Sequence, residues 1–386
     1  KETGDVKAVV AVGCMVQRYK DELATEIPEV DLFMGLTELQ GLVPELRRRE
    51  LLPPEEAVST MELPLRILST EGAHTSFLKI SEGCDHTCAF CAIPLMRGLH
   101  RSHPLEELVL EAQGLAASGV REINIISQDT TWYGRDVRRR DPEAELLPGL
   151  LRALLDRTTV DWYRLFYMYP SGTSREIVDL IAEGVARTEG PKIVPYLDMP
   201  LQHGSDRILT AMRRPERRAT IRERVGWLRE AIPDLTLRTT VIVGFPGETD
   251  EDFEELVELL EELRFDRVGA FTYSVEEGTR AAEMGDNVPE SLARERLERL
   301  MDVQRSISYE LNEDRIGTIA TALVDEVFSE DEQGYVGVAR TEAQAIDVDG
   351  VTHLLPSEAD APEPGGMIRV EIVEAEDYDL IGRVVT

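Results

Sequence analysis

The middle of the chain alternates six times between a strand-like run and a helical run, and this alternation is the strongest constraint on its fold. The strand-like runs are Ser76–Ile80, Glu122–Ile126, Trp162–Met168, Ile193–Met199, Leu235–Val243 and Arg267–Thr272. The helical runs are 104–118, 143–156, 174–186, 221–231, 250–263 and 289–315. Strands that are each followed by a helix favour a parallel sheet, so we predict an α/β fold with a full or partial, TIM-like (β/α) barrel. An open doubly wound sheet is the alternative.

Two smaller units flank this predicted barrel, which we place at residues 71–316. Residues 1–70 read as the end of a small α/β unit and a linker, with strands at 6–12 and 31–34, helices at 21–26 and from Thr37, and a proline-rich linker at 53–64. Residues 317–386 read as a small β-barrel of five short strands. These strands are expected at 318–327, 334–339, 345–348, 367–375 and 380–385.

The charge is strongly acidic, with 42 basic against 74 acidic residues and a net charge of −32. Such a surface repels phosphate backbones, so nucleic acid is an improbable substrate. Residues 317–386 carry three arginines against 16 acidic residues, about −13 in all. Two explanations stay open, and they do not exclude each other. One is a basic protein partner and the other is adaptation to a salt-rich cytoplasm.

Cysteine usage and hydropathy bound the setting of the protein. The chain has four cysteines in 386 residues, which is too few for a disulfide framework. No apolar run approaches the roughly 18 residues of a membrane span, so we expect no membrane contact. These features predict a reduced, cytoplasmic setting. The chain begins with Lys1, not Met, and we expect that part of the natural protein precedes it.

Three of the cysteines, Cys84, Cys88 and Cys91, lie within eight residues, directly after the first strand of the predicted barrel. Barrel enzymes keep their active sites at this carboxyl end of the strands. A cubane iron–sulfur cluster normally takes four protein ligands, so three thiolates would leave one iron open to bind another molecule. A zinc site completed by His86, or by a distant residue, is the alternative.

Further polar groups are expected at the same mouth. Ser127-Gln128-Asp129 ends the second strand, and Gln202-His203 follows the fourth. The loop 244–249 follows the fifth strand and opens a helix, where its glycines would let the backbone approach a ligand. Arg238 lies within the fifth strand, and it could pair with a ligand carboxylate or close a structural ion pair.

The sequence of the cysteine run, with an aromatic residue before Cys91, resembles the cluster motif of the radical S-adenosylmethionine (SAM) enzymes. The runs Cys84–Arg101, Ile126–Thr130, Pro195–Pro215 and Gly244–Thr249 together resemble one family within them, the radical SAM methylthiotransferases. Residues 317–386 are similar to that family's TRAM domain. The resemblance covers essentially the whole chain.

This resemblance implies the cofactors. Cys84, Cys88 and Cys91 would bind a [4Fe–4S] cluster whose open iron chelates SAM, and an external donor would supply the electron that cleaves SAM to a 5′-deoxyadenosyl radical. Cys14 would be one of three ligands to a second [4Fe–4S] cluster, which delivers sulfur. The family's other two such cysteines lie upstream, and the given chain has none there, so we expect one cluster per chain. The expected SAM contacts are Gln128, Asp129, Gln202, His203, Arg238, Gly244, Gly247 and Glu248.

The resemblance also implies the reaction. Tyr19, Gln128–Thr130 and Pro200–Ser205 are most similar to the branch that methylthiolates an aspartate β-carbon of small-subunit ribosomal protein twelve. A β C–H bond is too strong and too weakly acidic for a protein base, whereas a carbon radical can abstract its hydrogen. The sibling branch, which modifies adenosines of transfer RNA, is one alternative. A non-enzymatic metal-binding scaffold is the other.

Overall fold

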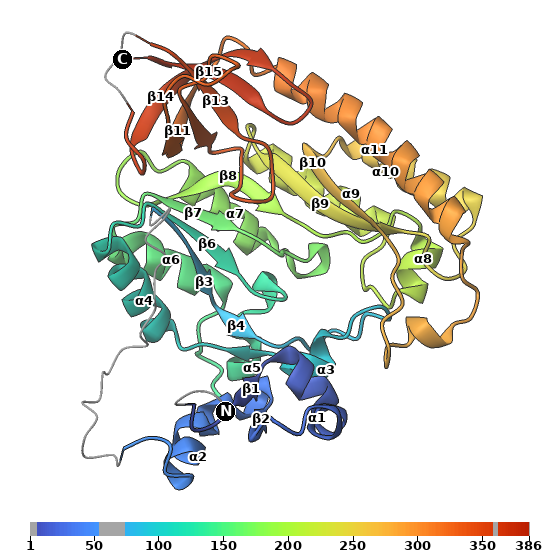
Figure 1. The fold of residues 1–386 in the computed structure, drawn as a ribbon. Coiled ribbons are helices and arrows are strands. Elements are labelled where there is room, and N and C mark those ends of the chain that lie inside the picture. Colours follow the sequence, from blue (N-terminus) through green and yellow to red (C-terminus); the bar gives the residue numbers. More distant parts are fainter. Residues whose placement is uncertain (1–5, 54–73, 358–361, 386) are drawn as a thin grey trace.

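The computed structural model describes residues 6–53, 74–357 and 362–385, and it arranges them in three units (Figure 1). The N-terminal unit and the C-terminal barrel lie at opposite ends of a central α/β unit. The predicted linker at 53–64 and the predicted boundary at residue 70 fall almost wholly outside the described residues. Among the described helices, none is both long and apolar enough to cross a membrane.

The N-terminal unit is a short parallel strand pair with helices. β1 (Val10–Val12) pairs with β2 (Leu32–Met34), and α1 (Cys14–Glu26) connects them. A 3₁₀ turn, η1 (Leu36–Gly41), and α2 (Leu42–Arg48) follow. The strand is shorter than predicted, and the helix begins earlier, at Cys14 itself. The α/β character predicted for this unit is confirmed.

The central sheet confirms the predicted parallel barrel in its partial form. Its strands are β3 (Thr75–Lys79), β6 (Glu122–Ile126), β7 (Trp162–Leu165), β8 (Lys192–Asp198), β9 (Thr236–Val243) and β10 (Arg267–Thr272). They pair in sequence order, all parallel, from β3 at one edge to β10 at the other. A doubly wound sheet would reverse its strand order partway, so this order excludes that alternative.

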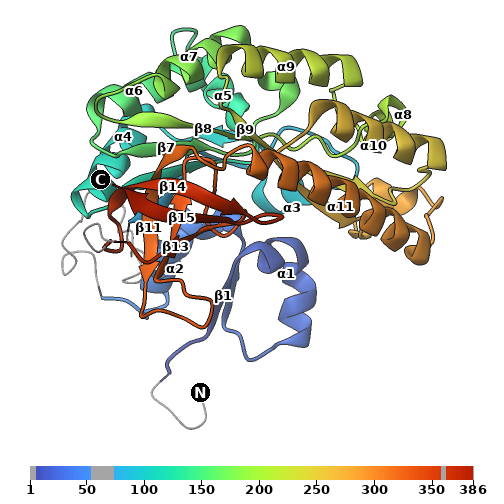
Figure 2. The same cartoon turned by 90° about the horizontal axis from the view of Figure 1, so that it is seen from above.

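Helices cover the outer face of the sheet, because each presents an apolar stripe to the strands. They are α4 (Leu105–Ala117), α6 (Leu147–Arg157), α7 (Arg175–Val185), α9 (Arg218–Ala231), α10 (Asp250–Leu263) and α11 (Glu290–Glu313). In α7 the Ser174 side chain caps the first turn, and Ile177, Val178 and Ile181 are buried against the sheet. Figure 2 shows α4, α6, α7, α9 and α10 as an arc outside the strands.

The short elements lie in the loops. They are α3 (Ile93–Arg97), α5 (Arg135–Arg138), α8 (Asp206–Ala211), the strands β4 (Ser81–Glu82) and β5 (Arg101–Ser102), and the 3₁₀ turns η3 (Thr130–Trp132), η4 (Pro170–Gly172) and η5 (Ala281–Glu283). The loops that follow the carboxyl ends of the strands contain β4, α3, η3, η4, α8 and η5. The mouth of the partial barrel is therefore built from these loops.

The C-terminal unit is a closed five-stranded barrel, as predicted. Its strands are β11 (Ile319–Val327), β12 (Gly337–Thr341), β13 (Thr352–Leu355), β14 (Met367–Ala375) and β15 (Leu380–Val385). The prediction of a strand at 345–348 is wrong, and the third strand is β13. Ala345 is buried in a cluster that includes Trp162 and Tyr196 of the central unit, so its apolar character reflects this packing and not a strand.

This barrel contacts the beginnings of the central strands. Arg340 of β12 pairs with Glu122, the first residue of β6, and Glu342 pairs with Lys192, the first residue of β8. The N-terminal unit instead contacts the loops at the carboxyl ends, where α1 packs against α3. The mouth of the partial barrel, at the carboxyl ends of the strands, therefore faces the N-terminal unit and not the C-terminal barrel.

Candidate active site

The three motif cysteines lie on a loop that a short hairpin closes at its base. The chain enters the loop through β4 and leaves it through β5, and these two strands pair antiparallel. Gly83 has a φ of +78°, and a Cβ there would lie 2.3 Å from the carbonyl oxygen of Leu99, so glycine is required. The Cys84 amide donates to the carbonyl of Gly98 at 3.1 Å. The backbone therefore fixes the first cysteine.

The middle of the loop is attached to other loops of the mouth. The Ala89 amide donates to the carbonyl of Met212 at 2.9 Å, and the Ala89 carbonyl accepts from the amide of Ala281 at 2.8 Å. Met212 follows β8 and α8, whereas Ala281 follows β10. The loop that starts at β3 therefore reaches across the mouth to the far strands of the sheet.

The thiols are sheltered from water. Cys84 is buried, and Cys88 and Cys91 are half-buried. Burial raises the pKa of the Cys84 thiol to about 12 and also raises the pKa of Cys91. The thiolate is the form that binds metal, so binding must displace these protons. In the described ranges no three His, Cys, Asp or Glu side chains are grouped so that they could hold a single metal ion.

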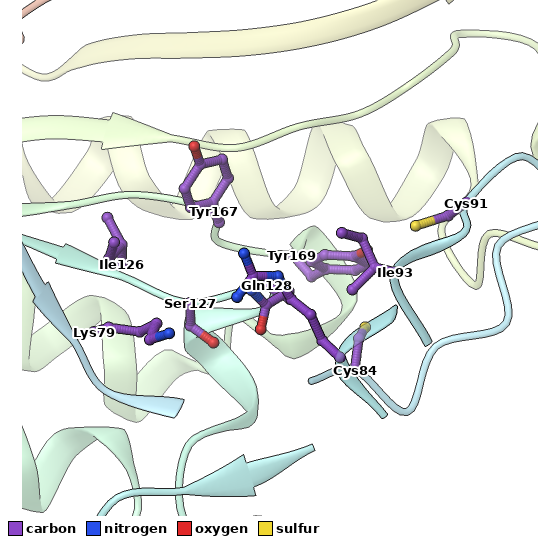
Figure 3. Close-up of a pocket in the computed structure, with 10 residues that line it drawn as sticks. Lys79, Cys84, Cys91, Ile93, Ile126, Ser127, Gln128, Tyr167 and Tyr169 are labelled. Atoms are coloured by element: carbon purple, nitrogen blue, oxygen red, sulfur yellow. The ribbon is translucent and has the colours of Figure 1, made fainter. Parts of the chain in front are cut away.

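A cavity of about 600 Å³ opens beside the cysteines (Figure 3). It is lined by Lys79, Cys84, Cys91, Ile93, Arg97, Ile126, Ser127, Gln128, Tyr167 and Tyr169. The volume lies within the range of small-molecule sites. The side-chain carbonyl oxygen of Gln128 is buried there without a hydrogen-bond partner. An amino group of a bound ligand would satisfy it, so the residues present fit a thiolate-held cluster with SAM beside it.

His86 packs next to this cavity and does not point to an open metal position. Its ring stacks on Tyr169, with centroids 4.3 Å apart and planes at 4°, and its Nε2 lies 2.7 Å from Oδ2 of Asp129. The other oxygen of Asp129 accepts hydrogen bonds from the amide and hydroxyl of Thr131. His86 thus packs and hydrogen-bonds beside the cysteine cavity. Both oxygens of Asp129, an expected SAM contact, have protein partners.

Two other expected contacts belong to a buried network on the far side of the mouth. The ring of His203 lies 3.2 Å from Glu248 Oε2, and this oxygen also accepts from the Gly244 amide at 2.9 Å. Arg296 of α11 donates to Glu248 Oε1 at 2.7 Å. Gly244 and Gly247 have φ of +71° and +79°, so both positions favour glycine. None of these residues lines the cysteine cavity, and contact with SAM stays a prediction for the four expected residues, His203, Gly244, Gly247 and Glu248.

Arg238 forms an ion pair within the protein, which is one of the two roles that the sequence left open. Its guanidinium donates to Asp198 Oδ1 at 2.7 Å and lies 3.8 Å from Asp349 of the C-terminal barrel. It lines a second cavity of about 370 Å³ that shares no lining residue with the first. Gln202, with a φ of +75°, bridges to Val241 of β9. For both residues a SAM contact stays a prediction.

Cys14 is the first residue of α1 and is half-buried. Two other residues of this helix hold it at the mouth: Arg18 donates to Glu276 Oε2 at 2.7 Å, and the Tyr19 hydroxyl lies 3.3 Å from Glu277 Oε2. Both glutamates belong to the loop after β10. The thiol of Cys14 therefore lies at the same end of the sheet as the cysteine cavity. Its role as a cluster ligand stays a prediction.

Several residues of the site were missed by sequence reasoning. Lys79 ends β3 and Tyr169 lies shortly after β7, so the rule that site residues lie at the carboxyl ends of the strands could have revealed both. Arg214 could not be found this way, because it follows α8 and reaches the site only in the folded chain. Its Nη1 lies 3.8 Å from the Cys88 sulfur, and its guanidinium lies over the Tyr169 ring at 3.9 Å.

Comparisons with known proteins agree with this geometry. The Radical SAM superfamily profile matches residues 78–260, and the TRAM domain profile matches residues 316–385. A relative from Anaeromyxobacter sp. (strain K) is 43% identical over all of this chain and 79% of its own length. One from Geobacter sulfurreducens is 41% identical over all of this chain and 84% of its own length. Both are named ribosomal protein uS12 methylthiotransferase RimO.

A solved structure supports the fold alone. It is the radical SAM methyltransferase TsrM from Kitasatospora setae with cobalamin and a [4Fe–4S] cluster bound, with a TM-score of 0.50 at 14% identity over 81% of this chain and 60% of its own. The predicted fold and family are confirmed, and with them the [4Fe–4S] and SAM cofactors. Because the relatives match along its entire length, this chain belongs to the RimO family of ribosomal protein uS12 methylthiotransferases.

Proposed function

We propose that the function of this family member is methylthiolation of the β-carbon of an aspartate in ribosomal protein uS12, and that the given chain supplies the site at which the β-hydrogen is abstracted. One observation carries the proposal: the cavity at the carboxyl ends of β3, β6 and β7 gathers Cys84, Cys91 and the unpartnered side-chain carbonyl oxygen of Gln128. It does so in a chain whose relatives are named ribosomal protein uS12 methylthiotransferase. The alternative of a non-enzymatic scaffold gives no reason for a small-molecule cavity beside the thiols.

The chain's own residues shelter and orient the reactants. When bound at Cys84, Cys88 and Cys91, a [4Fe–4S] cluster together with SAM supplies the radical that abstracts the β-hydrogen. Gln128 would accept a hydrogen bond from the amino group of SAM. Ile93 and Ile126 form apolar parts of the wall, which exclude water from a reactive radical. In the family's scheme Cys14 would be one of three ligands to the second cluster, from which the sulfur comes, and the given chain has no cysteine upstream of it.

Charge supports a basic protein as the substrate. The C-terminal barrel carries about −13, and the whole chain carries −32. Such a field attracts a basic ribosomal protein and repels transfer RNA. We also propose that an external electron donor supplies the electron that cleaves SAM.

Mass spectrometry of ribosomal protein uS12 and of transfer RNA from a strain that lacks the gene tests this function. We expect the methylthio group to be lost from the protein and kept on transfer RNA. Complementation with the natural gene should restore it, and the gene carrying Cys84→Ala should not. Loss of the group from transfer RNA alone would reject the proposal in favour of the sibling reaction.

A further inference from the structure

The cysteine cavity is positively charged in an otherwise acidic protein. Among the described residues that line it, the formally charged side chains are Lys79 and Arg97, and no aspartate or glutamate is among them. The whole chain has only 42 basic residues against 74 acidic ones. Two cations on the wall of one small cavity therefore need a physical explanation.

One nearby carboxylate neutralises these cations only in part. Lys79 at the end of β3 donates to Glu82 Oε2, and Arg97 of α3 donates to Glu82 Oε1 at 2.8 Å. Two positive charges share one negative charge, which leaves about one positive charge at the cavity wall.

Lys79 lies at the opposite end of the cavity from the cysteines. In Figure 3 Lys79 lies at the end remote from Cys91, with Ser127 and Gln128 between them, and its ammonium group points toward Ser127. Its side chain is 38% exposed, so it is accessible to a ligand. A cluster held by the three cysteines would bind SAM, together with its carboxylate, at the cysteine end. Lys79 shares Glu82 with Arg97, so its ammonium group can also meet a second anion at this end of the cavity.

We propose that Lys79, supported by Arg97, binds the side-chain carboxylate of the aspartate that is modified. This proposal rests on the proposed function. The hydrogen to be removed is on the β-carbon, which is bonded directly to the carboxylate carbon. Holding the carboxylate therefore aims the β C–H bond into the cavity, and such positioning lowers the barrier of the reaction. An adenosine has no carboxylate, so the same contact disfavours transfer RNA.

A double-mutant cycle between enzyme and peptide tests the contact. The reconstituted enzyme, with SAM, is titrated with a fluorescent peptide that carries the uS12 aspartate and with the same peptide carrying asparagine instead. A charge-assisted hydrogen bond predicts that asparagine weakens binding to the wild type about tenfold. For Lys79→Met we expect less than a twofold difference between the two peptides. Lys79→Arg should restore the preference for aspartate.

Lys20→Met is the matched control, because Lys20 pairs with Glu38 on the N-terminal unit, away from the cavity. It should keep the wild-type preference. Equal preference for aspartate in wild type and Lys79→Met would overturn the proposal. A rise in the SAM dissociation constant of Lys79→Met, with the peptide preference intact, would also overturn it and assign the lysine to the carboxylate of SAM.

A second measurement separates this proposal from the proposed function. With a peptide deuterated at the aspartate β-carbon, the wild type should transfer deuterium into 5′-deoxyadenosine. If the peptide cycle shows the expected coupling but no deuterium is transferred, Lys79 is supported as the carboxylate contact and the reaction is rejected. If deuterium is transferred without coupling, the reaction stands and the role of Lys79 is rejected.

Discussion

Arg340 of the C-terminal barrel and Glu122 at the start of β6 form a fully buried ion pair across the boundary between the two units. Glu122 also accepts from Arg164 Nε at 2.8 Å, and Arg340 Nε donates to Asp325 Oδ2 at 2.8 Å. The network lies at the beginnings of the central strands, whereas the cysteine cavity lies at their carboxyl ends. It therefore fastens the acidic barrel to the sheet without entering the cavity.

Replacing Arg340 with methionine should strongly destabilise this attachment. Breaking a buried pair by removing one partner leaves a buried charge uncompensated and costs about 3–5 kcal/mol. Arg164 still pairs with Glu122, so we expect the lower part of this range. Denaturant unfolding and limited proteolysis, which reports release of the C-terminal barrel, measure the effect. Arg383→Met is the control, because Arg383 is exposed on β15 and should change stability by less than about 0.5 kcal/mol.

The same network predicts a loss of stability in acid. Burial opposes the charges of Glu122 and Asp325, but Arg164 and Arg340 lower the pKa of Glu122, and His74 and Arg340 lower the pKa of Asp325. A carboxyl group with a lowered pKa in the folded state stabilises above its unfolded pKa, about 4.3 for Glu and 3.9 for Asp. This contribution disappears as the pH falls through the folded pKa.

We therefore expect the thermal midpoint to stay level from about pH 7 to pH 5 and to fall below about pH 4. In Arg340→Met the fall should be shallower, because these carboxyl groups have lost one cation. The stability difference between wild type and variant should narrow in acid. A difference that stays constant down to the acid limit would contradict a role for these pairs.

The order of the central sheet could be predicted because the alternation of strand and helix is a local property of the sequence. The third strand of the C-terminal barrel could not, because Ala345 is buried in a cluster with Trp162 and other residues of the central unit, which lie about 150 to 180 positions away. An apolar run indicates burial but does not say against what. The correct strand, Thr352–Leu355, begins only four positions after the end of the predicted one at residue 348.

The residues of the site likewise fall into those that local sequence predicted and those that depend on distant contacts. Cys84 and Gln128 were predicted because a motif and a strand end are visible in sequence, and both line the cavity. Glu248 was expected at SAM, yet its carboxylate is bound by Arg296 of α11, and that pairing depends on how a distant helix packs. Ion pairs between remote segments are the part of the site that single-sequence reasoning did not reveal.

Each cysteine of the motif should be required for the cluster. Cys84→Ala, Cys88→Ala and Cys91→Ala should each lose the visible absorbance and the iron of the reconstituted protein, because a cubane cluster needs these thiolates. We expect about four irons and four sulfides per wild-type chain, as for one cluster. Cys14→Ala should keep this content and serves as the control. About eight irons per chain would contradict a single cluster.

The positive charge of Arg214 should raise the reduction potential of the cluster. Its guanidinium lies 3.8 Å from the Cys88 sulfur, so its positive charge stabilises the more negative, reduced state. Removing Arg214 alone would leave Glu216 buried without its cation, so we pair Arg214→Met with Glu216→Gln and use Glu216→Gln alone as the control.

We expect the double variant to have a midpoint potential lower than that of the control by roughly tens of millivolts. An electron paramagnetic resonance titration of the reconstituted protein measures this difference without relying on turnover. Arg214→Lys, which keeps the charge but loses the planar fork over Tyr169, should show a smaller shift. Equal potentials in the double variant and the control would show that Arg214 only packs against the cluster loop.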